Sequence, residues 1–122
     1  MKKKIVIIGT LGYLGTELCR LYSGESHYHE IVGIDNRFVS ERVNQLRNWN
    51  IGFFQGQIFD KTFLKIHLKN TDIVHHLAGI TDVAYIKNES SRELDDKIKK
   101  IAIEGTNNIL EIAIANEVDG IV

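Results

Sequence analysis

The chain has 122 residues, of which 43% are hydrophobic and 25% are charged, and its formal net charge is -1 at pH 7. These values are ordinary for one globular domain, and the small net charge gives no reason to expect nucleic acid or a membrane surface as a partner. No apolar run reaches the length of a membrane span. The single cysteine, Cys19, excludes an internal disulfide and fits a reducing cytoplasm.

The first organised segment combines a strand, a glycine turn and a helix. Four branched apolar residues at 5–8 predict a strand that is buried on both faces. Glycines follow at positions 9, 12 and 15, and a helical pattern continues from Thr16. Unpaired N–H groups at a helix N-terminus bind anions well. We therefore expect bare amides between Gly9 and Gly15 to hold a phosphate group, although a turn that serves packing alone remains the alternative.

A second apolar run, residues 30–35, ends in Asp35, twenty positions after Gly15. A dinucleotide site places at this distance the carboxylate that binds the adenosine ribose hydroxyls. The strand, the turn, the helix and the acid together predict a dinucleotide site. A choice between NAD and NADP remains, because Asp35 would repel a 2′-phosphate whereas Arg37 and Arg42 could attract one. We favour NAD, since the acid occupies the ribose position itself.

The rest of the chain continues the alternation of strands and helices. Further strands are expected at 51–55, 72–77 and 118–122, and a long polar connection at 80–92. Two helices are expected to begin at the cap residues Ser40 and Asp60, and a long helix is expected from Glu93 to about Asn116. This alternation predicts an α/β fold with a doubly wound, mostly parallel sheet in the order 3-2-1-4(-5). Neighbouring His75 and His76 would face opposite sides of a strand, which argues against one shared metal site.

The sequence resembles the extended short-chain dehydrogenase/reductase family, whose members include nucleotide-sugar epimerases, dehydratases and reductases. Four stretches carry the resemblance: residues 8–15, Asp35-Asn36, His76-Leu77-Ala78-Gly79 and residues 105–110. The resemblance implies that residues 1–122 form a single NAD(P)-binding, Rossmann-like domain that is truncated at its C-terminus. NAD is the implied cofactor, and no metal is implied.

The resemblance also implies a set of cofactor-binding residues. Residues 11–14 would lie along the pyrophosphate, Asp35 would hold the adenosine ribose, Gln57-Ile58 would lie beside the adenine, and Ala78 would flank the nicotinamide side. The full set is Gly9, Leu11, Gly12, Tyr13, Leu14, Gly15, Asp35, Asn36, Gln57, Ile58, Leu77, Ala78 and Gly79.

The implied activity is that of a nucleotide-sugar epimerase or dehydratase that acts by transient hydride transfer to the nicotinamide. In the family this chemistry uses a Tyr-x-x-x-Lys pair, and none of the tyrosines, at 13, 22, 28 and 85, has a lysine four residues later. No catalytic residue can therefore be assigned, and the chain alone is expected to be inactive. The alternative is a self-sufficient dinucleotide-binding or sensing module without catalysis. The two apolar stripes of the long helix are compatible with a homodimer or with burial inside one chain.

Overall fold

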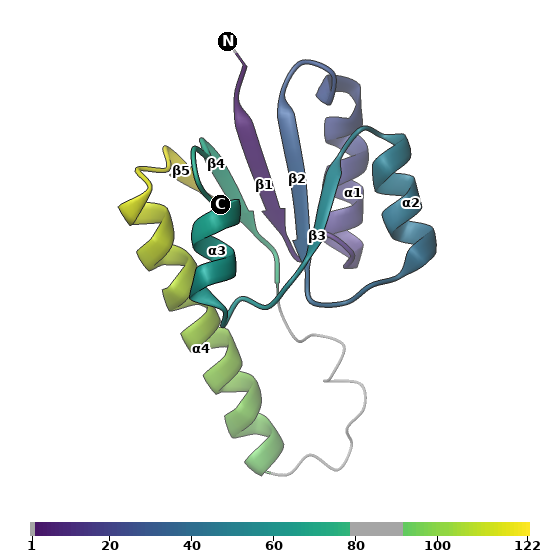
Figure 1. Cartoon of the computed structure of the whole chain (residues 1–122). Helices are drawn as coiled ribbons and strands as arrows, with labels where there is room; N and C mark the ends of the chain where they lie inside the picture. Colours follow the sequence, from purple (N-terminus) through teal and green to yellow (C-terminus); the bar gives the residue numbers. More distant parts are fainter. Residues whose placement is uncertain (1, 79–91) are drawn as a thin grey trace.

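The computed structural model describes residues 2–78 and 92–122, in which five parallel strands alternate with helices. The strand order is β3-β2-β1-β4-β5, which confirms the predicted doubly wound α/β fold (Figure 1). The elements are β1 (Lys4–Ile8), α1 (Tyr13–Tyr22), the 3-10 helix η1 (Ser23–Glu25), β2 (Glu30–Asp35), α2 (Ser40–Asn48), β3 (Gly52–Gln55), α3 (Lys61–His67), β4 (Ile73–His76), α4 (Arg92–Ala115) and β5 (Gly120–Ile121).

Strand β1 lies at the centre of the sheet. It pairs with β2 from Lys4 opposite Glu30 to Ile8 opposite Ile34, and on its other side Ile8 lies opposite His76 of β4. These strands therefore end nearly level with one another. The segments that follow them all emerge at the same edge, where open α/β sheets bind their ligands.

Both faces of the sheet are covered by helices, α1 and α2 on one face and α3 and α4 on the other (Figure 1). Ile5 and Ile7 contribute to the core under α1 and α2, whereas Val6 and Ile8 contribute to the core under α3 and α4. The continuous apolar run of β1 is thus explained, because successive side chains enter different cores and none of them faces water.

The two histidines of β4 confirm the expectation that they face opposite sides of the sheet. His75 Nε2 lies 2.8 Å from the hydroxyl of Tyr22 on α1, while His76 Nε2 lies 2.9 Å from the hydroxyl of Thr106 on α4. Burial lowers the pKa of both imidazoles. Both rings therefore join a helix to the sheet in their neutral form.

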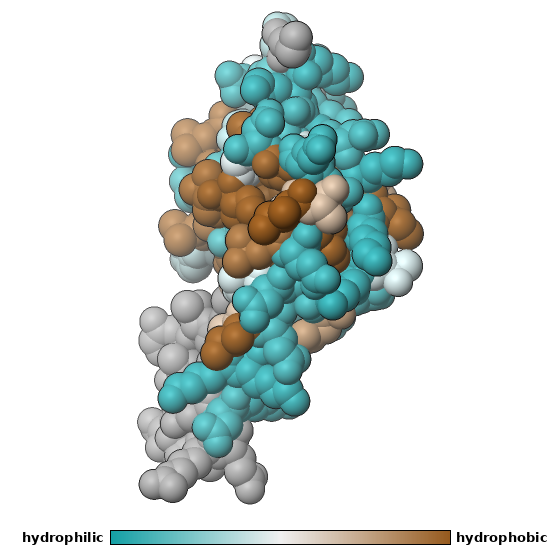
Figure 2. All heavy atoms as spheres, turned by 90° about the vertical axis from the view of Figure 1, so that its left-hand side faces the viewer, coloured by the Kyte–Doolittle hydropathy of each residue, from teal (hydrophilic) through white to brown (hydrophobic). Residues whose placement is uncertain are grey.

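Helix α4 buries one side and exposes another. Gly105, Ile109 and Ile112 are buried, whereas Ile103 and Ile114 are 60% and 73% exposed. Figure 2 shows hydrophobic residues gathered on the side of the molecule where α4 and β5 lie. The second apolar stripe of the predicted long helix thus lies in water here. None of the helices in the two described ranges has a segment long and apolar enough to cross a membrane.

The cap residue of α3 agrees with the prediction from the sequence, whereas that of α2 does not. Asp60 caps α3 as expected, since its carboxylate accepts a hydrogen bond from the Phe63 amide at 3.0 Å. Ser40 was expected to cap α2, but it is the first helical residue, and Val39 occupies the cap position without a side-chain bond.

We predict that Gly15→Ala destabilises the fold by about 1–3 kcal/mol, because a Cβ at position 15 would lie 2.1 Å from the carbonyl oxygen of Gly9. Gly24→Ala is the matched control, since nothing lies within 4 Å of the Cβ that it adds. Urea unfolding of both variants gives the comparison. Equal midpoints for the two variants would contradict the close approach of α1 to the turn.

We also predict that the free energy of unfolding decreases as the pH falls from about 7.5 to about 5.5. Burial lowers the pKa of His75 and His76, so the unfolded chain binds more protons in this range than the folded chain does. Urea unfolding at several pH values measures the slope. His76→Gln is expected to flatten it, and the same change at the exposed His27 serves as the control. A slope that His76→Gln leaves unchanged would contradict the prediction.

Candidate functional site

The predicted site residues that the structure describes gather at the carboxyl edge of the sheet. The turn at residues 9–15 follows β1, Asp35 ends β2 and Asn36 follows it, Gln57 and Ile58 come after β3, and Leu77 and Ala78 follow β4. Gly79 lies outside the described residues. Four segments that are far apart in the sequence are therefore brought to one edge by the parallel topology.

Gly9 and Gly15 make the turn after β1 possible. Gly9 has a φ of +88°, and a Cβ at this position would lie 2.6 Å from the amide nitrogen of Ala78. A Cβ at Gly15 would collide with the carbonyl oxygen of Gly9. Thr10 is fully buried below the turn, where its carbonyl accepts a hydrogen bond from the Thr16 hydroxyl at 3.1 Å.

Gly33 of β2 was not predicted as part of this arrangement. A Cβ there would lie 2.7 Å from Oγ1 of Thr10, so position 33 must be a glycine to leave room for Thr10 of the turn. The Thr10 hydroxyl also lies 3.0 Å from the Cys19 sulfur. Burial raises the pKa of the Cys19 thiol, which fits a packing residue and not a nucleophile.

The backbone amides of the turn fall into two groups. The amides of Gly9 and Thr10 donate to the Ile34 carbonyl at 2.8 and 3.2 Å, and that of Gly12 donates to the Gly9 carbonyl at 3.2 Å. The amide of Leu11 donates to Oδ2 of Asp35 at 2.9 Å. The expectation of bare amides throughout the turn is therefore wrong for residues 9–12, which are held by the protein's own acceptors.

The amides that follow Gly12 are placed differently. Tyr13, Leu14 and Gly15 form the first turn of α1, whose amides have no acceptor within the helix. The first bond of the helix runs from the Thr16 amide to the Gly12 carbonyl at 2.9 Å. Gly12 is the cap residue and offers no side chain to these amides. The positive end of the helix dipole is thus open to an anion.

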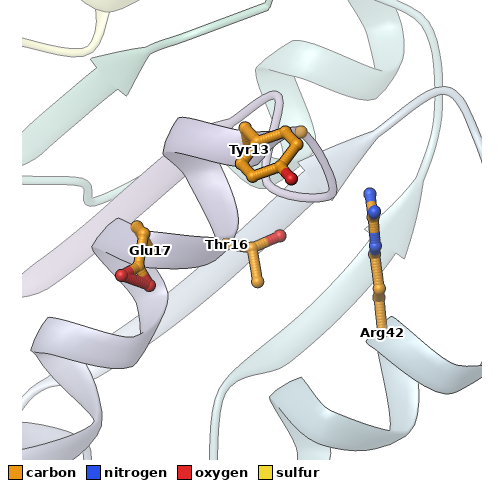
Figure 3. Close-up of a pocket in the computed structure, with 5 residues that line it drawn as sticks. Tyr13, Thr16, Glu17 and Arg42 are labelled. Atoms are coloured by element: carbon orange, nitrogen blue, oxygen red, sulfur yellow. The ribbon is translucent and has the colours of Figure 1, made fainter.

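The side chains of the turn fall into a buried group before Gly12 and an exposed group after it. Leu11 is fully buried in the core under α1 and α2, whereas Tyr13 and Leu14 are 90% and 72% exposed. Tyr13, Thr16 and Arg42 line a pocket between α1 and α2, and Figure 3 shows Arg42 extending from α2 towards the turn. Its guanidinium donates to the Leu11 carbonyl.

Among the described residues, Asp35 is the one buried acidic residue at this edge of the sheet, and only 4% of its side chain is exposed. Its Oδ1 accepts from the amide and Nε of Arg37 at 3.0 and 3.2 Å, while its Oδ2 accepts from Leu11 and from Nη2 of Arg37. The carboxylate therefore lies directly beside the glycine turn, and Arg37 neutralises its charge. Sequence reasoning noted Arg37 as a cation but did not predict this pairing.

The segment after β3 is fixed by α4. Ile58 packs against Gly105, where a Cβ would lie 2.0 Å from Cδ1 of Ile58, and the Ile58 carbonyl accepts from Nδ2 of Asn108 at 3.1 Å. Gln57 is exposed beside it. The supporting role of Asn108 was not predicted, although Asn108 lies in the segment 105–110, one of the four stretches that carry the family resemblance.

These residues fit a dinucleotide better than a metal ion. Three helix-start amides without an acceptor among the described residues, the glycine at position 12 and a carboxylate are the groups that a pyrophosphate and a ribose require. Among the described atoms, a Cβ at Gly12 would meet the Gly9 carbonyl oxygen at 3.4 Å and Nη2 of Arg37 at 3.7 Å. Within residues 2–78 and 92–122, no three His, Cys, Asp or Glu side chains are grouped so that they could hold a metal ion.

Known structures share this fold at low sequence identity. The chain aligns with a dTDP-glucose 4,6-dehydratase from Streptomyces venezuelae, crystallised with NAD and TYD, at a TM-score of 0.81 and 17% identity over 97% of this chain and 38% of that one. It aligns with a UDP-glucose-4-epimerase from Stenotrophomonas maltophila, crystallised with NAD and formylated UDP-arabinopyranose, at a TM-score of 0.76 and 19% identity over 95% and 34% of the two chains.

Comparison with curated sequences adds an uncharacterized protein, 052L, of Frog virus 3 (isolate Goorha), which is 27% identical over 108 residues, or 88% of this chain and 28% of the viral protein. The chain thus spans about a third of the length of the proteins that it matches. A family model covers residues 6–122, and this match confirms the resemblance to the extended short-chain dehydrogenases/reductases. The chain belongs to the 3-beta hydroxysteroid dehydrogenase/isomerase family.

Proposed function

We propose that this chain binds NAD at the carboxyl edge of its sheet and forms the cofactor-binding part of a nucleotide-sugar epimerase or dehydratase. The observation that carries the proposal is the pairing of two features at one place. The first turn of α1 presents uncapped amides, and the buried Asp35 carboxylate lies against the same turn. The first feature suits a pyrophosphate and the second a ribose diol.

Each segment of the edge then has a distinct role in binding. The amides of Tyr13, Leu14 and Gly15 hold the pyrophosphate, and Gly12 lets it approach the backbone. Asp35 accepts hydrogen bonds from the adenosine ribose. Gln57 and Ile58 lie beside the adenine, Asn36 belongs to the ribose end of the site, and Leu77 and Ala78 flank the nicotinamide half.

The nicotinamide would supply the hydride acceptor of the reaction. The residues of this chain bind and orient the cofactor, and none of them is assigned a proton-transfer role. The choice of a nucleotide sugar as substrate is supported by the two solved structures, whose ligands include nucleotides and a nucleotide sugar. A non-catalytic binding module would use the same cofactor site.

We predict that the wild-type chain binds NAD and that Gly12→Ala weakens this binding by about tenfold or more, equivalent to about 1.4 kcal/mol. The backbone angles of Gly12, φ -76° and ψ 177°, are open to alanine, so the change fills the face that the pyrophosphate would approach without straining the turn. Isothermal titration calorimetry measures the dissociation constants. Gly24→Ala, remote from the site, is the matched control and is expected to bind as the wild type does.

Two results would contradict the cofactor site. One is a wild-type chain that binds no adenine dinucleotide at millimolar concentration. The other is a Gly12→Ala variant that binds NAD as tightly as the wild type while its urea midpoint is unchanged.

We further predict that Asp35→Asn weakens NAD binding by about tenfold, because a neutral amide accepts weaker hydrogen bonds from a ribose than a carboxylate does. The asparagine oxygen can still accept from the Leu11 amide, so the turn is retained. The far-ultraviolet circular dichroism spectrum checks the fold. Unchanged affinity in a folded variant would remove Asp35 from the site.

A further inference from the structure

The segment that follows β3, residues 56–60, leaves the sheet from an edge strand. In the order β3-β2-β1-β4-β5, β3 has one neighbouring strand, β2. The Gly56 amide donates to the carbonyl of Asp35, the last residue of β2, at 3.0 Å. Beyond Gly56 the segment makes no hydrogen bond to a strand within residues 2–78 and 92–122. Its position must therefore depend on contacts outside the sheet.

A turn closes this segment, because the Asp60 amide donates to the Gln57 carbonyl at 3.0 Å. Ile58 and Phe59 are the two central residues of the turn. The peptide group between two such residues takes no part in the closing hydrogen bond, and its direction distinguishes one turn type from another. The carbonyl of that peptide group belongs to Ile58, and it accepts from Nδ2 of Asn108 at 3.1 Å. Asn108 therefore fixes the direction of the central peptide group.

The side chain of Ile58 contacts the same helix, α4. A Cβ at Gly105 would lie 2.0 Å from Cδ1 of Ile58, so the glycine leaves the space that this side chain fills. Ile58 is half-buried and packs against the core under α3 and α4, whereas its neighbours Gln57 and Phe59 are exposed. One polar and one apolar contact thus hold the centre of the turn against α4 and leave Gln57 accessible to a ligand.

Resting on the proposed function, we propose that Asn108 is a positioning residue for the adenine end of the cofactor site. Asn108 acts through the Ile58 carbonyl, fifty residues away in the sequence, and is not assigned a contact with the cofactor. Without its amide donor the turn is free to leave α4, and binding must then order the turn as well as the ligand. The net contribution of one such hydrogen bond corresponds to about a fivefold change in an equilibrium constant.

The test compares two adjacent asparagines of α4. Asn108 holds the Ile58 carbonyl, whereas Asn107 is exposed. We expect Asn108→Ala to raise the dissociation constants of NAD and of AMP by about fivefold each, and Asn107→Ala to leave both within about twofold of the wild type. Calorimetry with the full 122-residue chain measures NAD binding, and an NMR titration measures the binding of AMP, which has the adenine end of the cofactor without the nicotinamide.

Asn108→Asp is the second variant, because it keeps the shape of the side chain and replaces the amide donor by a carboxylate oxygen. We expect it to weaken NAD binding at least as much as Asn108→Ala does, since two acceptors would then face each other. Asn107→Asp adds the same charge at the adjacent position and is the matched control. Urea unfolding of all four variants shows which of them are folded under the conditions of the titrations, so that lost stability is not mistaken for lost affinity.

The outcomes separate this inference from the function on which it rests. A folded Asn108 variant that binds NAD and AMP as tightly as its Asn107 counterpart would overturn the role of Asn108 and leave the NAD site in place. A wild type that binds NAD but no AMP at millimolar concentration would also overturn that role, since the adenine end would then contribute no measurable affinity of its own. A wild type that binds neither ligand would overturn the proposed function and this inference together.

Discussion

The hydrogen bond between the Leu11 amide and Oδ2 of Asp35 is the interaction on which the edge of the sheet depends. It joins the end of β2 to the turn after β1 and gives a buried carboxylate a backbone partner, without which burial would be costly. Leu11 itself is fully buried in the core, and the amides of Tyr13, Leu14 and Gly15 begin α1. Together with the hydrogen bond from the Gly12 amide to the Gly9 carbonyl, this bond ends the part of the turn whose amides donate to acceptors of the protein itself.

A second set of contacts holds the edge from the other face of the sheet. Gly105 and Asn108 of α4 position Ile58, while Thr106 of the same helix meets His76 at the end of β4. One side of this helix thus aligns the segments after β3 and β4. Leu77, which follows β4, instead packs against the core under α1 and α2, the core that also contains Leu11 of the glycine turn. The segment after β4 is therefore held from both faces of the sheet.

The sheet could be predicted from the sequence because its strands are short apolar runs bounded by glycine and acidic residues. The cap at Asp60 could also be predicted, since it depends only on a carboxylate and an amide three residues apart. The pairing of Arg37 with Asp35 could not, because it depends on the path of the β2–α2 loop and on a side-chain rotamer. The capping of Leu11 escaped prediction because it requires the exact distance between two strand ends, which no local pattern encodes.

The side chains of Tyr13 and Leu14 extend into water, while their main-chain N–H groups have no acceptor among residues 2–78 and 92–122. Every amino acid except proline has such an N–H group, so the identity of these two residues is under little constraint from this part of the site. Only the glycines and the acid are tied to a residue type. Divergence can therefore accumulate around an unchanged backbone, as in the pair of proteins that share 17% of their residues and a TM-score of 0.81. The path of the backbone is thus shared by two proteins whose sequences differ at most positions.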